Sequence, residues 1–137
     1  MRPALRFFLL ALLVVGACKK GGDPRNPNIS GKWRLVSYSR GFSGILVPVP
    51  SDSVCVLSLN NDQTYGKTRN DTVYESGTYI ITRASAAYNE NETYPALKLV
   101  SPGGLAFLPL LISMEGDTLD LFENSTTGSG YRYGRAK

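Results

Sequence analysis

The residues that could do chemistry in this chain are two cysteines and a few acidic pairs, because the sequence contains no histidine. The absence of histidine removes the commonest general base and the ligand of most zinc sites. Paired carboxylates can hydrolyse glycosides, and Glu90/Glu92 and Asp117/Asp120 are such pairs. Both pairs lie in or beside polar stretches that predict solvated turns, where no burial would raise a carboxyl pKa. We therefore expect no enzymatic activity, no metal site and no cofactor.

The first cysteine, Cys18, stands at the end of an export signal. A basic start precedes an apolar run over residues 7–17, which is too short to cross ~30 Å of hydrocarbon as a helix. The end of this run resembles the lipobox of bacterial lipoproteins: Val15-Gly16-Ala17-Cys18. The resemblance implies cleavage before Cys18, thioether lipidation of its sulfur and acylation of the new amino group. An ordinary secretory signal with a chance cysteine is the alternative.

A lipidated Cys18 would tie the chain to a membrane, because each buried CH₂ contributes about 0.8 kcal/mol and several acyl chains act together. We expect the mature protein, carrying palmitate or similar chains, in the cell envelope, at the outer membrane of a Gram-negative bacterium. Residues 19–28 are rich in glycine, proline and charge and predict a flexible tether. The chain then divides into a signal peptide (1–17), a lipidated cysteine with its tether (18–28) and one domain (29–137).

The net charge and the second cysteine limit the kinds of partner and of covalent bond that we expect for this chain. Removal of Arg2 and Arg6 with the signal leaves 13 Lys and Arg against 11 Asp and Glu. These cations are scattered, so we expect no nucleic-acid partner. Cys55 has no disulfide partner in the chain if Cys18 carries lipid. Its apolar surroundings predict a buried hydrophobe, with a reactive thiol as the less favoured alternative.

Short runs rich in β-branched and aromatic residues, separated by glycine, asparagine, aspartate and proline, predict an all-β domain. The expected strands are Lys32–Ser39, Val54–Leu59, Thr64–Thr68, Glu75–Arg83, Pro95–Val100, Ala106–Met114, Thr118–Glu123 and Gly130–Arg135. About eight consecutive antiparallel strands predict a small up-and-down barrel, which leaves no exposed sheet edge.

Two connections are longer than the others. The apolar residues of Arg40–Ser53 predict either a lid over a barrel mouth or a strap packed on the wall. The stretch Ala84–Thr93 is polar and predicts a mobile loop. In the run 105–112 the alternation breaks, and Pro109 predicts a bulge or a sheet edge because it lacks a donor.

Alternation with a period of two assigns one face of each strand to the interior. On the first strand this face carries Trp33, Leu35 and Ser37. The residues expected to line any cavity are Leu35, Tyr79, Ile81, Leu97, Leu99, Leu119 and Leu121. The opposite faces are largely polar, which is typical of a barrel with its apolar side inward.

The segment Gly31-Lys32-Trp33-Arg34-Leu35-Val36-Ser37 resembles the opening strand of the lipocalin-like domains of bacterial lipoproteins, and Gly31-x-Trp33 matches the G-x-W hallmark of lipocalins. Further pieces follow in the expected order, over nearly all of residues 29–137: Leu57-x-Leu59, Asn61-Asp62-x-Thr64-Tyr65, Gly77-Thr78-Tyr79-x-Ile81, Gly116-Asp117-Thr118-Leu119-x-Leu121 and Tyr131-x-Tyr133-x-Arg135. The resemblance implies that Trp33 closes one barrel end beneath Arg135, or beneath Arg132 as the fallback. Such a cation–π contact contributes ~1 kcal/mol or more when desolvated. The alternative is a core tryptophan and a surface arginine that do not meet.

The resemblance also implies a membrane-anchored binding module for a small apolar ligand. The large side chains expected inside favour the alternative, a filled barrel that acts as a scaffold for an envelope protein. A lysozyme-inhibitor-like role is the third hypothesis, since its S-G-x-x-Y loop motif is approximated only by Ser76-Gly77-Thr78-Tyr79 and by residues 127–131. A cavity of several hundred cubic ångströms would favour ligand binding.

Overall fold

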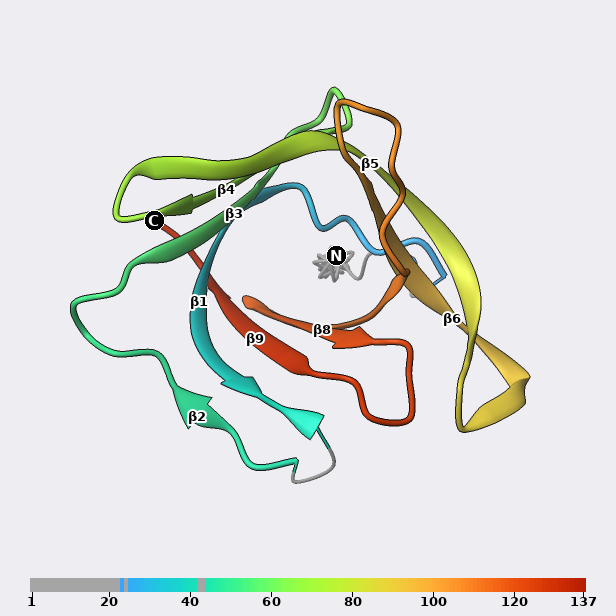
Figure 1. Cartoon of the computed structure of the whole chain (residues 1–137). Coiled ribbons are helices and arrows are strands. Elements are labelled where there is room, and N and C mark those ends of the chain that lie inside the picture. The colour runs from blue at the N-terminus through green and yellow to red at the C-terminus, as the bar shows by residue number, and fades with distance from the viewer. Residues whose placement is uncertain (1–22, 24, 42–43) are drawn as a thin grey trace, which may run out of the picture.

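The structure is a computed structural model that describes residues 23, 25–41 and 44–137. In it, the alternating segments pair largely in sequence order and form a closed sheet. The strands are β1 (Gly31–Ser39), β2 (Val47–Pro48), β3 (Cys55–Leu59), β4 (Thr64–Arg69), β5 (Thr72–Ala86), β6 (Asn89–Val100), β7 (Leu110–Glu115), β8 (Thr118–Glu123) and β9 (Gly130–Arg135). Each pairs antiparallel with its neighbour from β3 onwards, and β9 returns to β1 (Figure 1). The predicted all-β, up-and-down barrel of eight strands is confirmed, with β2 as one extra strand.

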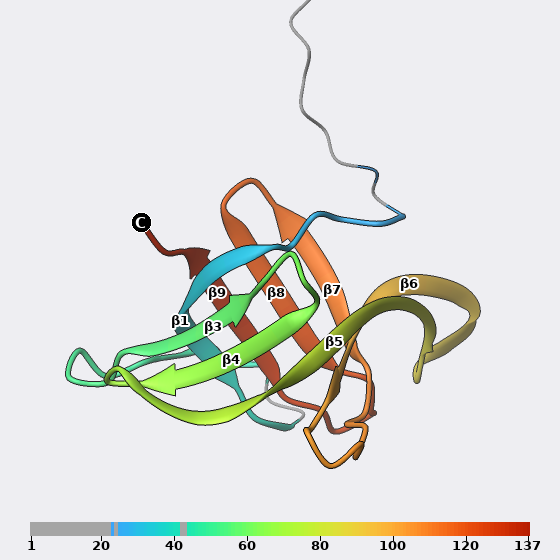
Figure 2. The ribbon, with the colours of Figure 1, turned by 90° about the horizontal axis from the view of Figure 1, so that it is seen from above.

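The strands and the buried core all fall within residues 29–137, so the barrel is complete without the first 28 residues. The proposed signal peptide and Cys18 lie outside the described residues. No helix in the described part of the chain has the length and apolar character needed to span a membrane. The described start of the chain, residues 23 and 25–29, runs past one end of the barrel (Figure 2).

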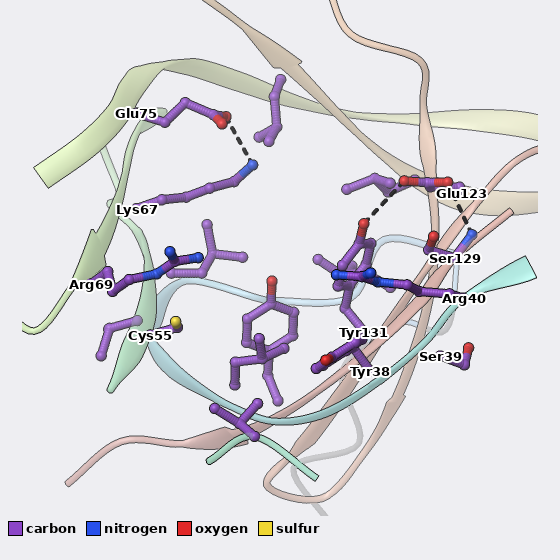
Figure 3. A pocket seen from close by; sticks show the side chains of 18 of the residues that line it. Tyr38, Ser39, Arg40, Cys55, Lys67, Arg69, Glu75, Glu123, Ser129 and Tyr131 are labelled. Carbon is purple, nitrogen blue, oxygen red and sulfur yellow. Dashed lines mark hydrogen bonds and ion pairs between the residues drawn. The ribbon is translucent and has the colours of Figure 1, made fainter. Parts of the chain in front are cut away.

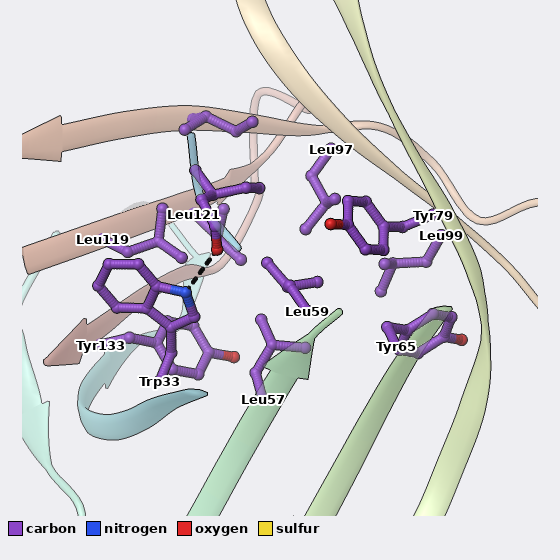
Figure 4. Close-up of a cluster of buried hydrophobic side chains, with 12 residues drawn as sticks. Trp33, Leu57, Leu59, Tyr65, Tyr79, Leu97, Leu99, Leu119, Leu121 and Tyr133 are labelled. Carbon is purple, nitrogen blue, oxygen red and sulfur yellow. Dashed lines mark hydrogen bonds between the residues drawn. The ribbon is translucent and has the colours of Figure 1, made fainter. Parts of the chain in front are cut away.

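One end of the barrel, called here the filled end, is packed around Trp33. Its side chain is fully buried, and its indole Nε1 donates a 2.7 Å hydrogen bond to the carbonyl oxygen of Ile29. Buried apolar side chains from the surrounding strands contact it or each other (Figure 4). They are Leu57, Leu59, Tyr65, Tyr79, Leu97, Leu99, Ile112, Leu119, Leu121 and Tyr133. Fully burying a leucine contributes about 1.5–3 kcal/mol, so this cluster is the main source of stability.

Arg135 lies over the outer face of this cluster. Its guanidinium carbon is 4.2 Å from the centre of the Trp33 ring, and its Nε donates to Asp117 at 3.1 Å. A side chain at Gly31 would place its Cβ 2.8 Å from the Arg135 guanidinium, and φ there is +131°. Glycine at this position therefore gives Arg135 its place on the indole. Arg132, the fallback, instead donates twice to Asp120, at 2.8 and 3.0 Å.

The stretch Ala84–Thr93 is not the mobile loop expected from its polar composition. β5 and β6 continue through it as a hairpin, with Ala84 opposite Tyr94 and Ser85 opposite Thr93. Ala86 packs beneath the hairpin with Ala96 and Leu111 in a second small core. The prediction was wrong because an exposed antiparallel ribbon gains its backbone hydrogen bonds even where most side chains are polar.

The predicted strand Ala106–Met114 begins later than expected. β7 starts at Leu110, directly after Pro109, and Ala106 makes only an isolated bridge to Val100. β6 and β7 share two residue pairs, Ala96 with Leu111 and Leu97 with Leu110. Because proline cannot donate to the ladder, strand pairing begins only after it.

Within the long connection Arg40–Ser53, the described residues 44–53 form a strap beside the wall. Its strand β2 pairs with Ser37 and Tyr38, beyond the point where β3 leaves β1. The backbone N–H of Val49 then donates to the carbonyl oxygen of Val36 at 2.9 Å. In the described part of this connection, β2 extends the sheet beside β1, and Val49 and Pro50 line one side of the open end, so of the two alternatives the strap describes this part of the chain.

Candidate functional site

A cavity of about 820 Å³ opens at the end of the barrel opposite the filled end. Its rim is formed by the strap (Val49, Pro50), by Phe107 and Leu108, and by the β8–β9 connection. Leucine side chains lie beneath it: Leu35, Leu57, Leu99, Leu110 and Leu121. The cavity therefore has an apolar floor and an opening to solvent.

A β-bulge in β1 changes which residues face this cavity. Leu35 lies opposite Tyr133 and Tyr38 opposite Tyr131, with the register shift between them. Opposite residues of an antiparallel pair share a face, so Tyr38 points inward although it is three positions beyond Leu35. Ser37, predicted to face inward, lies opposite Arg132 instead, because Val36 is the extra residue of the bulge; it is still buried, at the point where β2 pairs with β1.

A second bulge lies in β5 at the same open end. Lys67 pairs with Glu75, whereas the next residue, Thr68, pairs with Val73, which leaves Tyr74 as the extra residue. Tyr74 is half exposed at the rim of the cavity. The two bulges each add a tyrosine to the mouth, an arrangement that strict alternation would not produce.

The inner face of β4 carries two cations in a row, Lys67 and Arg69, after the buried Tyr65. Lys67 Nζ forms a 2.8 Å ion pair with Glu75, and the Tyr65 hydroxyl donates to the same carboxylate at 3.0 Å. Burial, and then the hydrogen bond to Glu75, raise the pKa of Tyr65 to about 12. Glu75 is thus held by two donors.

The opposite wall holds the second carboxylate of the cavity, Glu123. It accepts hydrogen bonds from the Tyr131 hydroxyl at 3.0 Å and from the Ser129 backbone N–H at 2.9 Å. Burial, followed by Glu123, raises the pKa of Tyr131, and burial raises that of Tyr133 further still. Both phenols therefore stay protonated at neutral pH, and the phenol of Tyr131 donates to Glu123.

Two arginines reach into the mouth from facing walls (Figure 3). Arg69 lies 5.7 Å from the centre of the Tyr74 ring, and Arg40 lies 5.4 Å from that of Tyr38. Among the described residues, no carboxylate forms an ion pair with Arg69. The mouth therefore combines tyrosine faces with guanidinium groups.

Cys55 pairs with Arg69 across the β3–β4 ladder and lines the cavity. It is half-buried and free, with its Sγ 3.7 Å from the Ser53 hydroxyl. Its surroundings are therefore more polar than the buried hydrophobe expected from its sequence neighbours.

The predicted lining residues divide between the two ends. Leu35, Leu99 and Leu121 border the cavity. Tyr79, Leu97 and Leu119 are buried in the core, and Ile81 is partly buried against it. Trp33 and Arg135 meet at the filled end. The structure thus brings three of the predicted residues to the site and uses the others for packing.

The cations of the cavity, Arg40, Lys67 and Arg69, were not among the candidates because only apolar residues were expected inside. The alternation that places Tyr65 inward also places Lys67 and Arg69 inward, so the sequence carried a signal for two of them. Arg40 follows the β1 bulge, which no pattern in the sequence indicated.

No group of three or more metal-ligating side chains is present in the described ranges. The chain matches no family model, no curated protein and no solved structure.

Proposed function

We propose that the mature chain is a lipid-anchored, lipocalin-like protein of the cell envelope that binds a small molecule with an apolar body in the open end of its barrel. The observation that carries this proposal is the cavity of about 820 Å³ above a leucine floor. Its size lies within the ~300–1,000 Å³ of small-molecule sites, which combine an apolar lining with a few polar groups. The anchor would be the acylated Cys18, and the tether would be residues 19–28.

A scaffold that contacts another envelope protein is the second candidate. It is favoured by exposed apolar side chains on the segments that border the mouth, namely Ile45, Leu105 and Leu108. The third hypothesis has less support, since Ser76–Tyr79 lies within β5, where Tyr79 is buried and cannot form a protruding loop motif.

Native mass spectrometry of the processed chain, extracted from its own envelope, tests the proposal. We expect one noncovalent small molecule per chain, which is lost on denaturation, and acyl chains on Cys18, which are retained. Leu35→Trp fills the cavity and should remove the noncovalent molecule. Ile80→Trp, on the exposed face of β5, is the matched control and should keep it. A chain without a small molecule but with a stoichiometric partner protein would support the scaffold instead.

A further inference from the structure

We propose that the ligand is a single-chain amphiphile whose anionic headgroup, a carboxylate or a phosphate, is held at the cavity mouth by Arg69, with Arg40 facing it. This inference rests on the function proposed above and specifies the class of ligand. It starts from the charged side chains of the cavity. They are three cations, Arg40, Lys67 and Arg69, and two carboxylates, Glu75 and Glu123.

Both carboxylates already have donors. Glu75 is engaged by Lys67 Nζ and the Tyr65 hydroxyl, and Glu123 by the Tyr131 hydroxyl and the Ser129 N–H. Neither is placed to neutralise Arg69, which forms no ion pair within the described part of the chain. The cavity therefore has one more positive charge than negative charges, and the uncompensated charge lies at its mouth.

Arg69 is placed to bind the headgroup of a ligand rather than to pair with another side chain of the barrel wall. Its guanidinium lies against the Tyr74 ring, which covers one face and leaves the N–H edge for an acceptor. In Figure 3, Arg69 and Arg40 point toward one another from opposite walls. Two like charges that face each other across an opening are stabilised by an anion between them, and arginine can bind carboxylate or phosphate through two parallel hydrogen bonds.

The lining of the cavity changes from charged at the mouth to apolar at the floor, and this change sets the orientation of the ligand. Lys67 and Arg69 follow one another on the inner face of β4, with Arg69 nearer the mouth, while Leu99 and Leu121 lie in the buried floor. An apolar chain gains free energy in proportion to the area it removes from water, so it enters towards the leucines. The charged end then remains at the guanidinium groups, where it keeps contact with solvent.

The test is a set of calorimetric titrations of residues 18–137 with Cys18→Ser, produced without the signal peptide; this chain contains the whole barrel and carries no acyl chain of its own. The probes share one alkyl chain and differ in headgroup: dodecanoate, dodecyl phosphate, dodecanol and dodecyltrimethylammonium, each below its micelle concentration. We expect at least one of the two anions to bind about tenfold more tightly than dodecanol, and the cation to bind more weakly than the alcohol. The preference should decrease as salt is added, because exposed charges are screened. The tighter of the two anions identifies a fatty acid or a phospholipid product as the source.

Arg69→Met should weaken binding of the preferred anion about tenfold and leave dodecanol unchanged, and Arg69→Lys should fall between it and the unchanged chain. Arg34→Met is the matched control, because it removes the same charge from an exposed position of β1 outside the cavity. Circular dichroism establishes that each variant is folded.

The outcomes separate the two proposals. If dodecanol binds as tightly as the anions, or if Arg69→Met leaves anion binding unchanged, the headgroup assignment is overturned while the binding function stands. If no alkyl chain binds at all, the proposed function itself fails.

Discussion

At the end of the barrel beside Ile29, the inward positions carry large apolar side chains around Trp33, whereas at the other end they carry Lys67, Arg69 and Glu75. The same strands contribute to both ends. β4 changes from the buried Tyr65 to the exposed Arg69 within its own length. The filled end has apolar contacts on all sides, and the open end has hydrogen-bonded polar groups around empty space.

This difference shows how a barrel of about a hundred residues can keep a cavity. The buried leucines and Trp33 form one compact cluster at the filled end, which supplies most of the stabilising burial. The two carboxylates of the mouth, Glu75 and Glu123, have hydrogen-bond donors, Arg69 is exposed to solvent, and no buried side-chain nitrogen or oxygen among the described residues lacks a hydrogen-bond partner. The mouth is therefore maintained at little cost, because its polar groups are paired or wet.

The largest expected effect comes from removing the side chain at the centre of the filled end. Trp33→Ala should lower the free energy of unfolding by about 3–5 kcal/mol, because it leaves a cavity that the closed sheet cannot collapse around. Urea denaturation followed by circular dichroism measures this loss. Tyr74→Ala, at the rim, should cost less than about 1 kcal/mol, since its side chain is 57% exposed. Equal losses of unfolding free energy in the two variants would contradict the conclusion that the filled end supplies most of the stability.

A backbone contact gives the next largest effect. A Cβ at Gly77 would lie 2.0 Å from the carbonyl oxygen of Val100, so Gly77→Ala must displace one strand. We expect a loss of about 3 kcal/mol in urea denaturation. Gly66→Ala, in the neighbouring strand, is the control, because nothing lies within 4 Å of its Cβ, and it should change stability by less than about 1 kcal/mol. A tolerated alanine at Gly77 would mean that β5 and β6 do not approach as closely as described.

The smallest expected effect is a pH dependence of the stability that comes from Tyr65. This residue is part of the buried core, and its hydroxyl donates to Glu75 in the cavity. Its pKa is about 12 in the folded chain, above the ordinary value of 10.0, so the folded state holds the proton more tightly than the unfolded state. Stability from this group is therefore fully present below about pH 10 and is lost as pH rises towards about 12, by up to ~2 kcal/mol. Urea midpoints measured across this range should fall.

Tyr65→Phe should reduce this alkaline loss without abolishing it, because burial also raises the pKa of Tyr133. Tyr88→Phe, on the exposed hairpin tip, leaves Tyr65 and Glu75 in place and should keep the full slope. A slope unchanged by Tyr65→Phe would show that this phenol does not couple the core to the cavity.

Alternation was sufficient to predict the barrel and several strand boundaries. β8 and β9 begin and end where the sequence predicted, and β1 begins one residue earlier, at Gly31. Alternation failed to predict the strands of residues 84–93. Both faces of that ribbon are exposed to solvent, so apolar and polar residues do not alternate along it. The predicted strand Ala106–Met114 also began too early, because the run 105–112 is apolar although its alternation breaks, and β7 begins only after Pro109.

The cavity was harder to predict than the fold. A bulge leaves no mark in composition: alternation already placed Val36 on the outer face, where it is 51% exposed, but nothing in the sequence indicated that Tyr38 beyond it would face inward. The inward positions of Lys67 and Arg69 followed from Tyr65 by alternation, but their role depends on empty space above the leucines. That space is set by how the strands tilt and close, which residue patterns do not specify.

The two bulges have a consequence for how this barrel can diverge. Each extra residue is absorbed within its own strand: beyond Val36 the strand resumes its pairing, with Tyr38 opposite Tyr131, and the pairing around Trp33 is unchanged. Deleting Val36 would remove the bulge and leave Leu35, Ser37 and Tyr38 in plain alternation, with Tyr38 still facing inward. A strand of this barrel can therefore gain or lose one residue near the mouth without turning the side chains beyond it to the opposite face.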